Sequence, residues 1–164
     1  MSVYLAADHA GFEMKNVLID FVRDELNYKV EDCGAHEFDA SDDYPLILKK
    51  AAERLASDVA RGVESFAIVC GGSAQGEAVA MNRHKGVRCG VFYGWDEALQ
   101  PDTTGNEYSL LESMRAHDDT NALALASRML SLDSAKEAVR TWLGAHIDVD
   151  ERHKRRIDQL DQLG

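Results

Sequence analysis

A glycine-rich turn followed by an acidic residue has the chemistry of an anion site beside a proton acceptor. Residues 71–76 read Gly-Gly-Ser-Ala-Gln-Gly and join a continuous apolar run to a helical pattern. Glycines close together let backbone N–H groups converge, and the start of a helix adds a positive dipole end, so this turn can hold an anion. Glu77 follows in the first helical turn, where it can act as a general base if partial burial restores its basicity. Tight packing of the turn and attraction of Glu77 to the helix dipole are the alternatives without chemistry.

Polar residues also stand beside two other apolar runs. Asp8 and His9 follow the run Val3–Ala7, and His117 with Asp118 precedes the run 122–125. An acid next to an imidazole at the edge of a sheet suits a polar ligand. A solvated turn at the first place and a capped turn at the second are the alternatives.

The densest positive patch of the chain lies in its last expected helix. Arg152 and Arg156 are four residues apart, so they share a helix face and can present two guanidinium groups to a phosphate. The chain has 18 Lys and Arg against 29 Asp and Glu, a net charge of −11, so an anionic small ligand must meet such a local cluster. A solvated basic face is the alternative, and Arg128 is a second, isolated candidate.

Composition, charge and cysteine spacing exclude several classes of protein. The negative charge repels nucleic acid and anionic lipid, and no window holds 18 consecutive apolar residues, so neither a nucleic-acid partner nor a membrane span is expected. The first apolar run lacks a basic stretch before it and ends at Asp8, which indicates a strand rather than a signal peptide and hence a cytoplasmic location. Cys33, Cys70 and Cys89 lie far apart without a C-x-x-C pair, so we expect reduced, mostly buried thiols and neither a disulfide framework nor a zinc site.

The elements that must position these residues alternate between strands and helices. Apolar runs predict strands over 3–7, 28–33, 66–70, 86–92 and 122–125. Helical spacing predicts helices over 11–26, from the start signal at 41–45 to residue 62, from 76 to about 83, and over 133–146 and 150–163. This alternation predicts one domain, an open three-layer α/β sandwich around a five-stranded, mainly parallel sheet. Ligands of such sheets bind beyond the carboxyl ends of the strands, near the switch in strand order.

Residues 93–113 are the irregular part of the domain. They hold Gly, Pro and Asn and few apolar residues, which predicts a long inserted loop with about one helical turn.

Neither of the two turns has a nucleotide-binding fingerprint. The segment 71–76 places Ser73 where G-x-G-x-x-G needs its second glycine, and no G-K-[ST] follows. The turn after the first strand holds Asp8 where a pyrophosphate would approach, which argues against NAD.

The ordered set of motifs resembles the type B ribose-5-phosphate isomerases and their galactose-6-phosphate isomerase relatives, from Val3 to about Leu160. The motifs are, in order, Asp8 to Lys15, Asp43-Tyr44-Pro45, residues 71–77 with Asn82, His117, Asn121 to Leu125, and Arg152 with Arg156. The resemblance implies a Rossmann-like α/β sandwich, a homodimer or homotetramer with its active site between subunits, and no metal or cofactor. It also implies interconversion of aldose and ketose phosphates through a cis-enediol.

The resemblance assigns roles to individual residues. Glu77 would be the base that moves a proton between C1 and C2. The family's alternative catalytic cysteine corresponds to Gly71, so Cys70 would be structural. Asp8 would handle the protons of the sugar hydroxyls, His117 would open the furanose ring, and Ser73 would stabilise the enediolate together with the backbone N–H groups of Gly72, Ala74, Gln75 and Gly76. Tyr44 would line the pocket, and the phosphate would be held by His9, Arg128, Arg152 and Arg156.

Three departures from the family pattern bear on the substrate. Asp118 stands where Asn is usual, Ala74 stands where Gly is frequent and narrows the turn, and the insertion at 93–113 lies beside the expected sugar site with Trp95, Asp96, Glu97, Glu107 and Tyr108. We therefore expect an aldose–ketose isomerase of a sugar phosphate, with ribose 5-phosphate first. A hexose 6-phosphate or another sugar phosphate is the alternative substrate, and a non-catalytic phosphosugar-binding protein is the alternative class.

Overall fold

A computed structural model describes residues 1–95, 101–102, 105–148 and 150–163. The strands are β1 (Ser2–Ala7), β2 (Lys29–Gly34), β3 (Ser65–Gly71), β4 (Cys89–Phe92) and β5 (Ala122–Ala126). The α-helices are α1 (Phe12–Asp20), α2 (Tyr44–Ala60), α3 (Gln75–Met81), α4 (Leu110–Asp118), α5 (Leu132–Gly144) and α6 (Glu151–Leu160), and a π-helical turn, η1 (Phe21–Glu25), follows α1.

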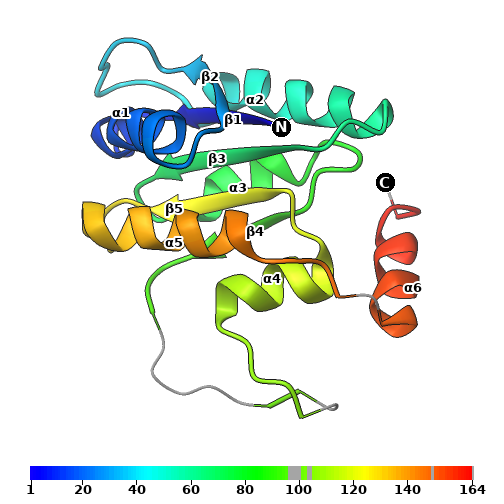
Figure 1. Ribbon diagram of the computed structural model, residues 1–164. Coiled ribbons are helices and arrows are strands. Elements are labelled where there is room, and N and C mark those ends of the chain that lie inside the picture. The colour runs from blue at the N-terminus through cyan, green and yellow to red at the C-terminus, as the bar shows by residue number, and fades with distance from the viewer. Residues whose placement is uncertain (96–100, 103–104, 149, 164) are drawn as a thin grey trace.

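The five strands form one sheet in the order β2-β1-β3-β5-β4, and every neighbouring pair is parallel (Figure 1). All seven residues of β3 and all five of β5 are buried, as continuous apolar runs in the middle of a parallel sheet require. From β1 the chain passes through α1 to β2, which pairs with one edge of β1. It then passes through α2 to β3, which pairs with the other edge of β1. The strand order therefore reverses between β1 and β3, and the carboxyl ends of these two parallel strands lie side by side.

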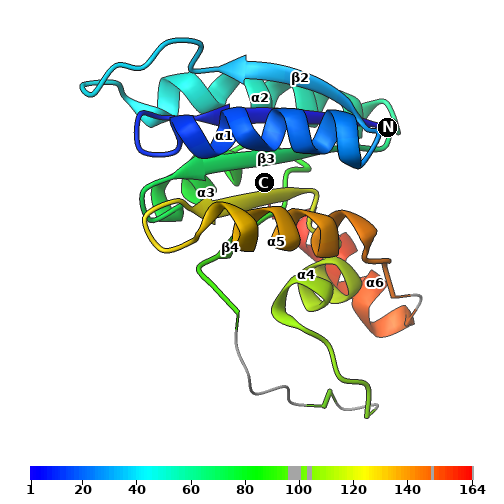
Figure 2. The ribbon, with the colours of Figure 1, turned by 60° about the vertical axis from the view of Figure 1, so that its left-hand side comes forward.

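Helices cover both faces of the sheet, which confirms the three-layer α/β sandwich. Figure 2 shows α1 and α5 in front of the sheet and α2 and α3 behind it. Two separate apolar clusters follow from this arrangement, one between the sheet and α1 with α5, the other between the sheet and α2 with α3. No helix among the described residues is long and apolar enough to cross a membrane.

Two helical segments differ from what the sequence predicts. The helix expected over 11–26 changes at Phe21 into a wider turn, in which the Leu26 N–H donates to the Phe21 carbonyl at 3.2 Å. The end of the expected loop at 93–113 is the start of α4. Ser109 caps that helix: its hydroxyl accepts from the Glu112 N–H, and the Glu112 carboxylate accepts from the Ser109 N–H. This S-x-x-E capping box is a local signal that the low apolar content of the segment obscured.

Candidate active site

The carboxylate of Glu77 lies against the backbone at the carboxyl end of β3. Glu77 is in the first turn of α3 and is 4 % exposed. A Cβ atom at Gly71 would overlap Cδ and Oε1 of Glu77, so the absence of a side chain at residue 71 leaves the room that this carboxylate occupies. The glycine-rich turn thus holds the proton acceptor beside the strand end.

The surroundings of Glu77 make it more basic than an ordinary glutamate. Burial raises its pKa, and the nearby Asp8 carboxylate raises it further, while a backbone hydrogen bond and the charge of Arg128 lower it. The net direction is upward. A base in this position needs such partial desolvation, because nearby N–H donors otherwise lower the pKa of a carboxylate.

Residues 71–76 are held in a tight turn by the neighbouring strand end and by Tyr44. The N–H groups of Ser127 and Arg128, which follow β5, donate to the carbonyls of Gly71 and Gly72 at 2.9 and 3.2 Å. Ala74 has φ +61°, a left-handed conformation that costs an L-residue about 1–2 kcal/mol and that glycine adopts freely. That Ala74 narrows the turn stays a prediction, since the structure shows only this left-handed backbone conformation.

Two other predicted residues border the same turn. A Cβ atom at Gly76 would lie 2.7 Å from the Tyr44 hydroxyl, and one at Gly72 would lie 3.0 Å from the Arg128 guanidinium carbon. Tyr44 and Arg128 therefore lie directly over the turn. Ser73 is exposed at its tip, and Gln75 begins α3. The structure thus brings together Glu77, Ser73, Tyr44 and Arg128 as expected.

Asp8 and His9 lie at the adjacent end of β1. The N–H groups of Ala10 and Gly11 donate to Oδ1 of Asp8 at 3.0 and 3.2 Å, and Asp8 is 7 % exposed, so the solvated-turn alternative is wrong. Nδ1 of His9 lies 2.7 Å from Oδ1 of Asp42. That hydrogen bond raises the pKa of His9. Asp42 is a residue that the sequence analysis missed, because it reads there only as part of a helix start.

The remaining predicted residues lie at the opposite end of the sheet in the same chain. The last turn of α4 holds His117 and Asp118 and leads into the amino end of β5, and α6 with Arg152 and Arg156 packs beside α4 (Figure 1). Glu77 follows the carboxyl end of β3, which pairs with β5. The five residues of β5 alone span about 16 Å. One chain therefore cannot close both groups of residues around one small sugar phosphate.

His117 is packed within its own polar group. Its Nδ1 lies 3.1 Å from the Ser113 hydroxyl, its Nε2 lies 3.7 Å from Oδ2 of Asp102, and its ring centroid lies 4.3 Å from that of His153. Donor atoms of His117, His153 and Asp148 lie within 4.8 Å of one another, as a metal site would require. However, Nη2 of Arg152 lies 3.0 Å from Nε2 of His153. Because guanidinium only donates, neutral His153 carries its proton on Nδ1, the nitrogen that faces Asp148, and offers no lone pair there.

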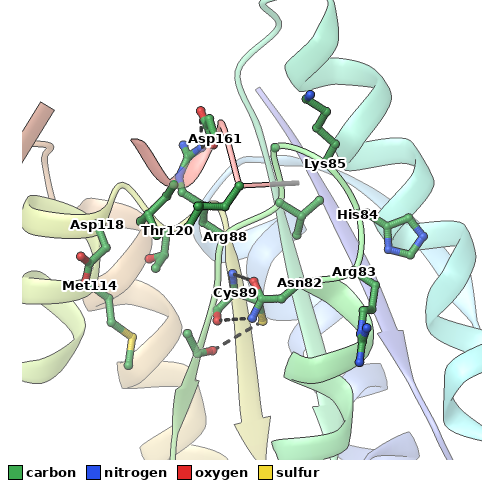
Figure 3. Close-up of a pocket in the computed structure, with 15 residues that line it drawn as sticks. Asn82, Arg83, His84, Lys85, Arg88, Cys89, Met114, Asp118, Thr120 and Asp161 are labelled. Carbon is green, nitrogen blue, oxygen red and sulfur yellow. Dashed lines mark hydrogen bonds and ion pairs between the residues drawn. The ribbon is translucent and has the colours of Figure 1, made fainter. Parts of the chain in front are cut away.

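A cavity of about 550 Å³ lies at the amino end of β4 (Figure 3), and Glu77 is not among the residues that line it. Arg88 in its wall is neutralised by Asp119 at 2.6 Å and Asp161 at 3.0 Å, and Asn82 exchanges hydrogen bonds with the backbone of Cys89. Its lining lacks an acid–base pair resembling Asp8 with Glu77. The size of this cavity does not make it the catalytic site.

The cysteines are poorly suited to catalysis. Burial raises the pKa of Cys70 to about 12, and burial raises that of Cys33 to about 11. Cys70 lies beneath the turn of Asp8 to Gly11, where a Cβ atom at Gly11 would overlap its carbonyl. The thiolate that a nucleophile or base needs is disfavoured at both positions.

The sequence and the fold of this chain match known proteins of one family. Residues 3–160 match the family model described as Ribose/Galactose Isomerase. The chain is 33% identical over 160 residues to "Ribose-5-phosphate isomerase B" of Mycolicibacterium paratuberculosis, covering 98% of this chain and 89% of that relative. It is 27% identical over 161 residues to "D-erythrulose-4-phosphate isomerase 2" of Mycolicibacterium smegmatis, covering 98% and 95%. The crystal structure of ribose-5-phosphate isomerase B from Mycoplasma genitalium with bound ribulose-5-phosphate superposes with a TM-score of 0.82 at 26% identity, covering 98% of this chain and 94% of that one.

Proposed function

The chain belongs to the ribose/galactose isomerase family and is a sugar-phosphate aldose–ketose isomerase, and from this premise we propose that it interconverts ribose 5-phosphate and ribulose 5-phosphate. The relatives named ribose-5-phosphate isomerase B cover nearly the whole chain, and the superposed structure holds ribulose-5-phosphate. The observation that carries the proposal is the buried Glu77 carboxylate, held over Gly71 beside Asp8 at the switch point of the sheet.

Glu77 is the base of the proposed reaction. Its carboxylate removes the proton from C2 of the open-chain aldose, the electron pair forms the C1=C2 double bond, and O1 takes up negative charge. A proton passes from O2 to O1 by way of Asp8. Glu77 then returns its proton to C1 while O2 becomes the ketose carbonyl. A base with a raised pKa suits both halves of this transfer, because it must accept and release the same proton.

The glycine-rich turn supports this chemistry electrostatically. The exposed Ser73 and the N–H groups of residues 72–76 are fixed before the substrate arrives, so they stabilise the enediolate without reorganisation. Tyr44 closes one side of the turn. His9 and Arg128 supply positive charge for the phosphate at this end of the sheet.

A second copy of the chain completes the site in this proposal. His117, Asp118, Arg152 and Arg156 cannot reach Glu77 within one chain, but a two-fold axis brings the amino-end group of each copy to the carboxyl-end group of the other. Leu46 on α2 and Val79 on α3 are 75% and 57% exposed near the turn, which fits a covered surface. His117 then opens the ring, and Arg152 with Arg156 complete the phosphate site. A homodimer is the smallest assembly that does this, and a homotetramer contains it.

Because of the inserted segment and Asp118, another sugar phosphate is the second candidate for the substrate. Trp95 at the start of the insertion donates through Nε1 to the Ser134 hydroxyl at 3.0 Å, and Pro101 pairs with Glu107 further along. Asp96 and Glu97 lie outside the described residues. The family resemblance to a relative named for D-erythrulose 4-phosphate favours testing shorter sugars as well as hexose 6-phosphates. A non-catalytic binding protein would have no use for the buried pair of Asp8 and Glu77.

Proton exchange in D₂O tests the proposal directly. We expect deuterium from solvent to enter beside the carbonyl of ribose 5-phosphate, and Glu77→Gln to abolish the exchange. Tetrose 4-phosphates and hexose 6-phosphates, run in parallel, identify a different substrate. Tight binding of these sugars without exchange would establish the binding protein instead. The expected cytoplasmic location and the expected independence of metals and cofactors stay predictions.

A further inference from the structure

Asp42, in the loop between β2 and α2, contacts His9 twice through one carboxylate oxygen. Oδ1 of Asp42 lies 2.7 Å from Nδ1 of His9 and accepts the backbone N–H of His9 at 3.2 Å. The Asp42 side chain is only 10% exposed, and within the described part of the chain its buried Oδ2 has no hydrogen-bond partner. The carboxylate is therefore shielded from water and directed at one imidazole ring.

This contact determines which nitrogen of His9 faces the site. An ionised carboxylate only accepts hydrogen bonds, so the ring carries a proton on Nδ1. No described residue bonds Nε2, which is left for a ligand. The His9 side chain as a whole is 30% exposed.

The charged groups around His9 favour the cationic ring. The hydrogen bond to Asp42 has the largest influence and raises the pKa of His9, while partial desolvation of the ring lowers this pKa. The charge of Asp8 raises the pKa further, and the charge of Arg128 lowers it. Oδ2 of Asp8 lies 4.0 Å from Nδ1 of His9. In the same loop as Asp42, hydrogen bonds from Ser41 lower the pKa of Asp39, and the charge of the His9 ring contributes to this shift. A protonated ring donates from Nε2, which suits a phosphate oxygen.

We propose that Asp42 is a positioning residue for His9: it holds the imidazolium with Nε2–H directed at the substrate phosphate and supplies its counter-charge. This inference rests on the proposed function, in which His9 binds the phosphate. The sign of the effect separates it from simple repulsion. A carboxylate that merely lay near a phosphate would repel it, so its removal would tighten binding. Removal of a positioning carboxylate weakens binding.

Asp42→Asn tests the proposal, with Asp39→Asn as the matched control. Both substitutions remove one negative charge from the same loop, but the Asp39 carboxylate bonds Ser41 and not His9. For Asp42→Asn we expect the KM for ribose 5-phosphate to rise about tenfold, with kcat within about twofold of the wild type. The alkaline limb of 1/KM against pH should move to lower pH. For Asp39→Asn we expect KM within about twofold. An unchanged or lower KM in Asp42→Asn, or an equal rise in both variants, overturns the proposal.

Two measurements separate this proposal from the proposed function. Nitrogen NMR of the wild-type His9 ring should show a proton on Nδ1 in the neutral state, and a neutral ring protonated on Nε2 would overturn the proposal even if no variant folds. Titration with inorganic phosphate should show weaker binding to Asp42→Asn than to Asp39→Asn. If that difference is found while no sugar phosphate is isomerised, the proposed function fails and the role of Asp42 stands.

Discussion

The two ends of the sheet carry polar groups of different construction. At the carboxyl ends of β1 and β3, Asp8 and Glu77 are 7% and 4% exposed and fixed by strand ends and tight turns. At the amino end, the basic residues project from α6, a ten-residue helix in which His153 is the one buried residue. Proton transfer requires positions fixed to a fraction of an ångström, whereas a phosphate is held by long cationic side chains that adapt. From this contrast we propose that the first group carries the proton transfer, and that the second group, from another copy, opens the ring and completes the phosphate site.

Replacement of the proposed base should have the largest effect. We expect Glu77→Gln to lower kcat by about three orders of magnitude with a small change in KM, because the amide cannot accept the C2 proton. Steady-state kinetics measures both constants. Cys70→Ala is the control, since burial raises the pKa of that thiol to about 12, and it should retain kcat within about threefold. An active Glu77→Gln beside an inactive Cys70→Ala would reverse the assignment.

A methyl group at residue 71 should disturb the same carboxylate without removing it. In Gly71→Ala the new Cβ overlaps the position of the Glu77 carboxylate, so we expect kcat to fall about a hundredfold through displacement of the base. Gly144→Ala in α5 is the matched control, because a Cβ there meets no atom within 4 Å. Its kcat should match the wild type. Equal kcat in both variants would mean that the Glu77 position is not critical.

The basic helix should affect binding rather than chemistry. We expect Arg156→Ala to raise KM about tenfold and leave kcat within about threefold, because it loses a charge-assisted hydrogen bond to the phosphate. Arg155→Ala is the matched control. It removes the same charge from the neighbouring position on α6, and adjacent residues lie on different sides of a helix. Inhibition by inorganic phosphate measures the loss without the sugar. A fall in kcat alone for Arg156→Ala would contradict a phosphate-binding role.

The smallest expected effect is a shift of the pH profile. Glu77 must be ionised to act as a base, and its pKa is raised above the ordinary 4.5, so the acid limb of kcat/KM should lie above pH 4.5. Arg128 lowers the pKa of Glu77, so Arg128→Gln should move the acid limb to higher pH by a fraction of a pH unit. The same substitution should also raise KM. Asp39→Asn should leave the acid limb unmoved, because Asp39 is not among the groups that shift the pKa of Glu77. A limb that moves down in Arg128→Gln would contradict this electrostatic description.

The carboxyl-end group could be predicted from the sequence because each part is local. The apolar runs before Asp8 and Gly71 identify buried parallel strands, and parallel strands end at the same edge of the sheet. The proximity of Asp8 to Glu77, 69 residues later, follows from that rule alone.

The rest of the site could not be derived in the same way. Asp42 contacts His9 through a loop whose path no periodicity describes, and its position before Tyr44 reads as a helix start. The start of α4 at Leu110 depends on a capping box within a segment of low apolar content. The sequence pattern also left open that β3 pairs directly with β5, which places Glu77 and His117 at opposite ends of two neighbouring strands.

Mixing two inactive variants tests the central claim, that two copies share each site, most directly. Glu77→Gln lacks the carboxyl-end base and His117→Ala lacks the amino-end imidazole, so each should be inactive alone. If the groups meet across a two-fold axis, each hybrid dimer holds one intact site. Random exchange makes half of the dimers hybrid, so an equal mixture should recover about a quarter of the wild-type activity. Mass spectrometry verifies that hybrids form. Hybrids with no more activity than the separate variants would contradict the shared site.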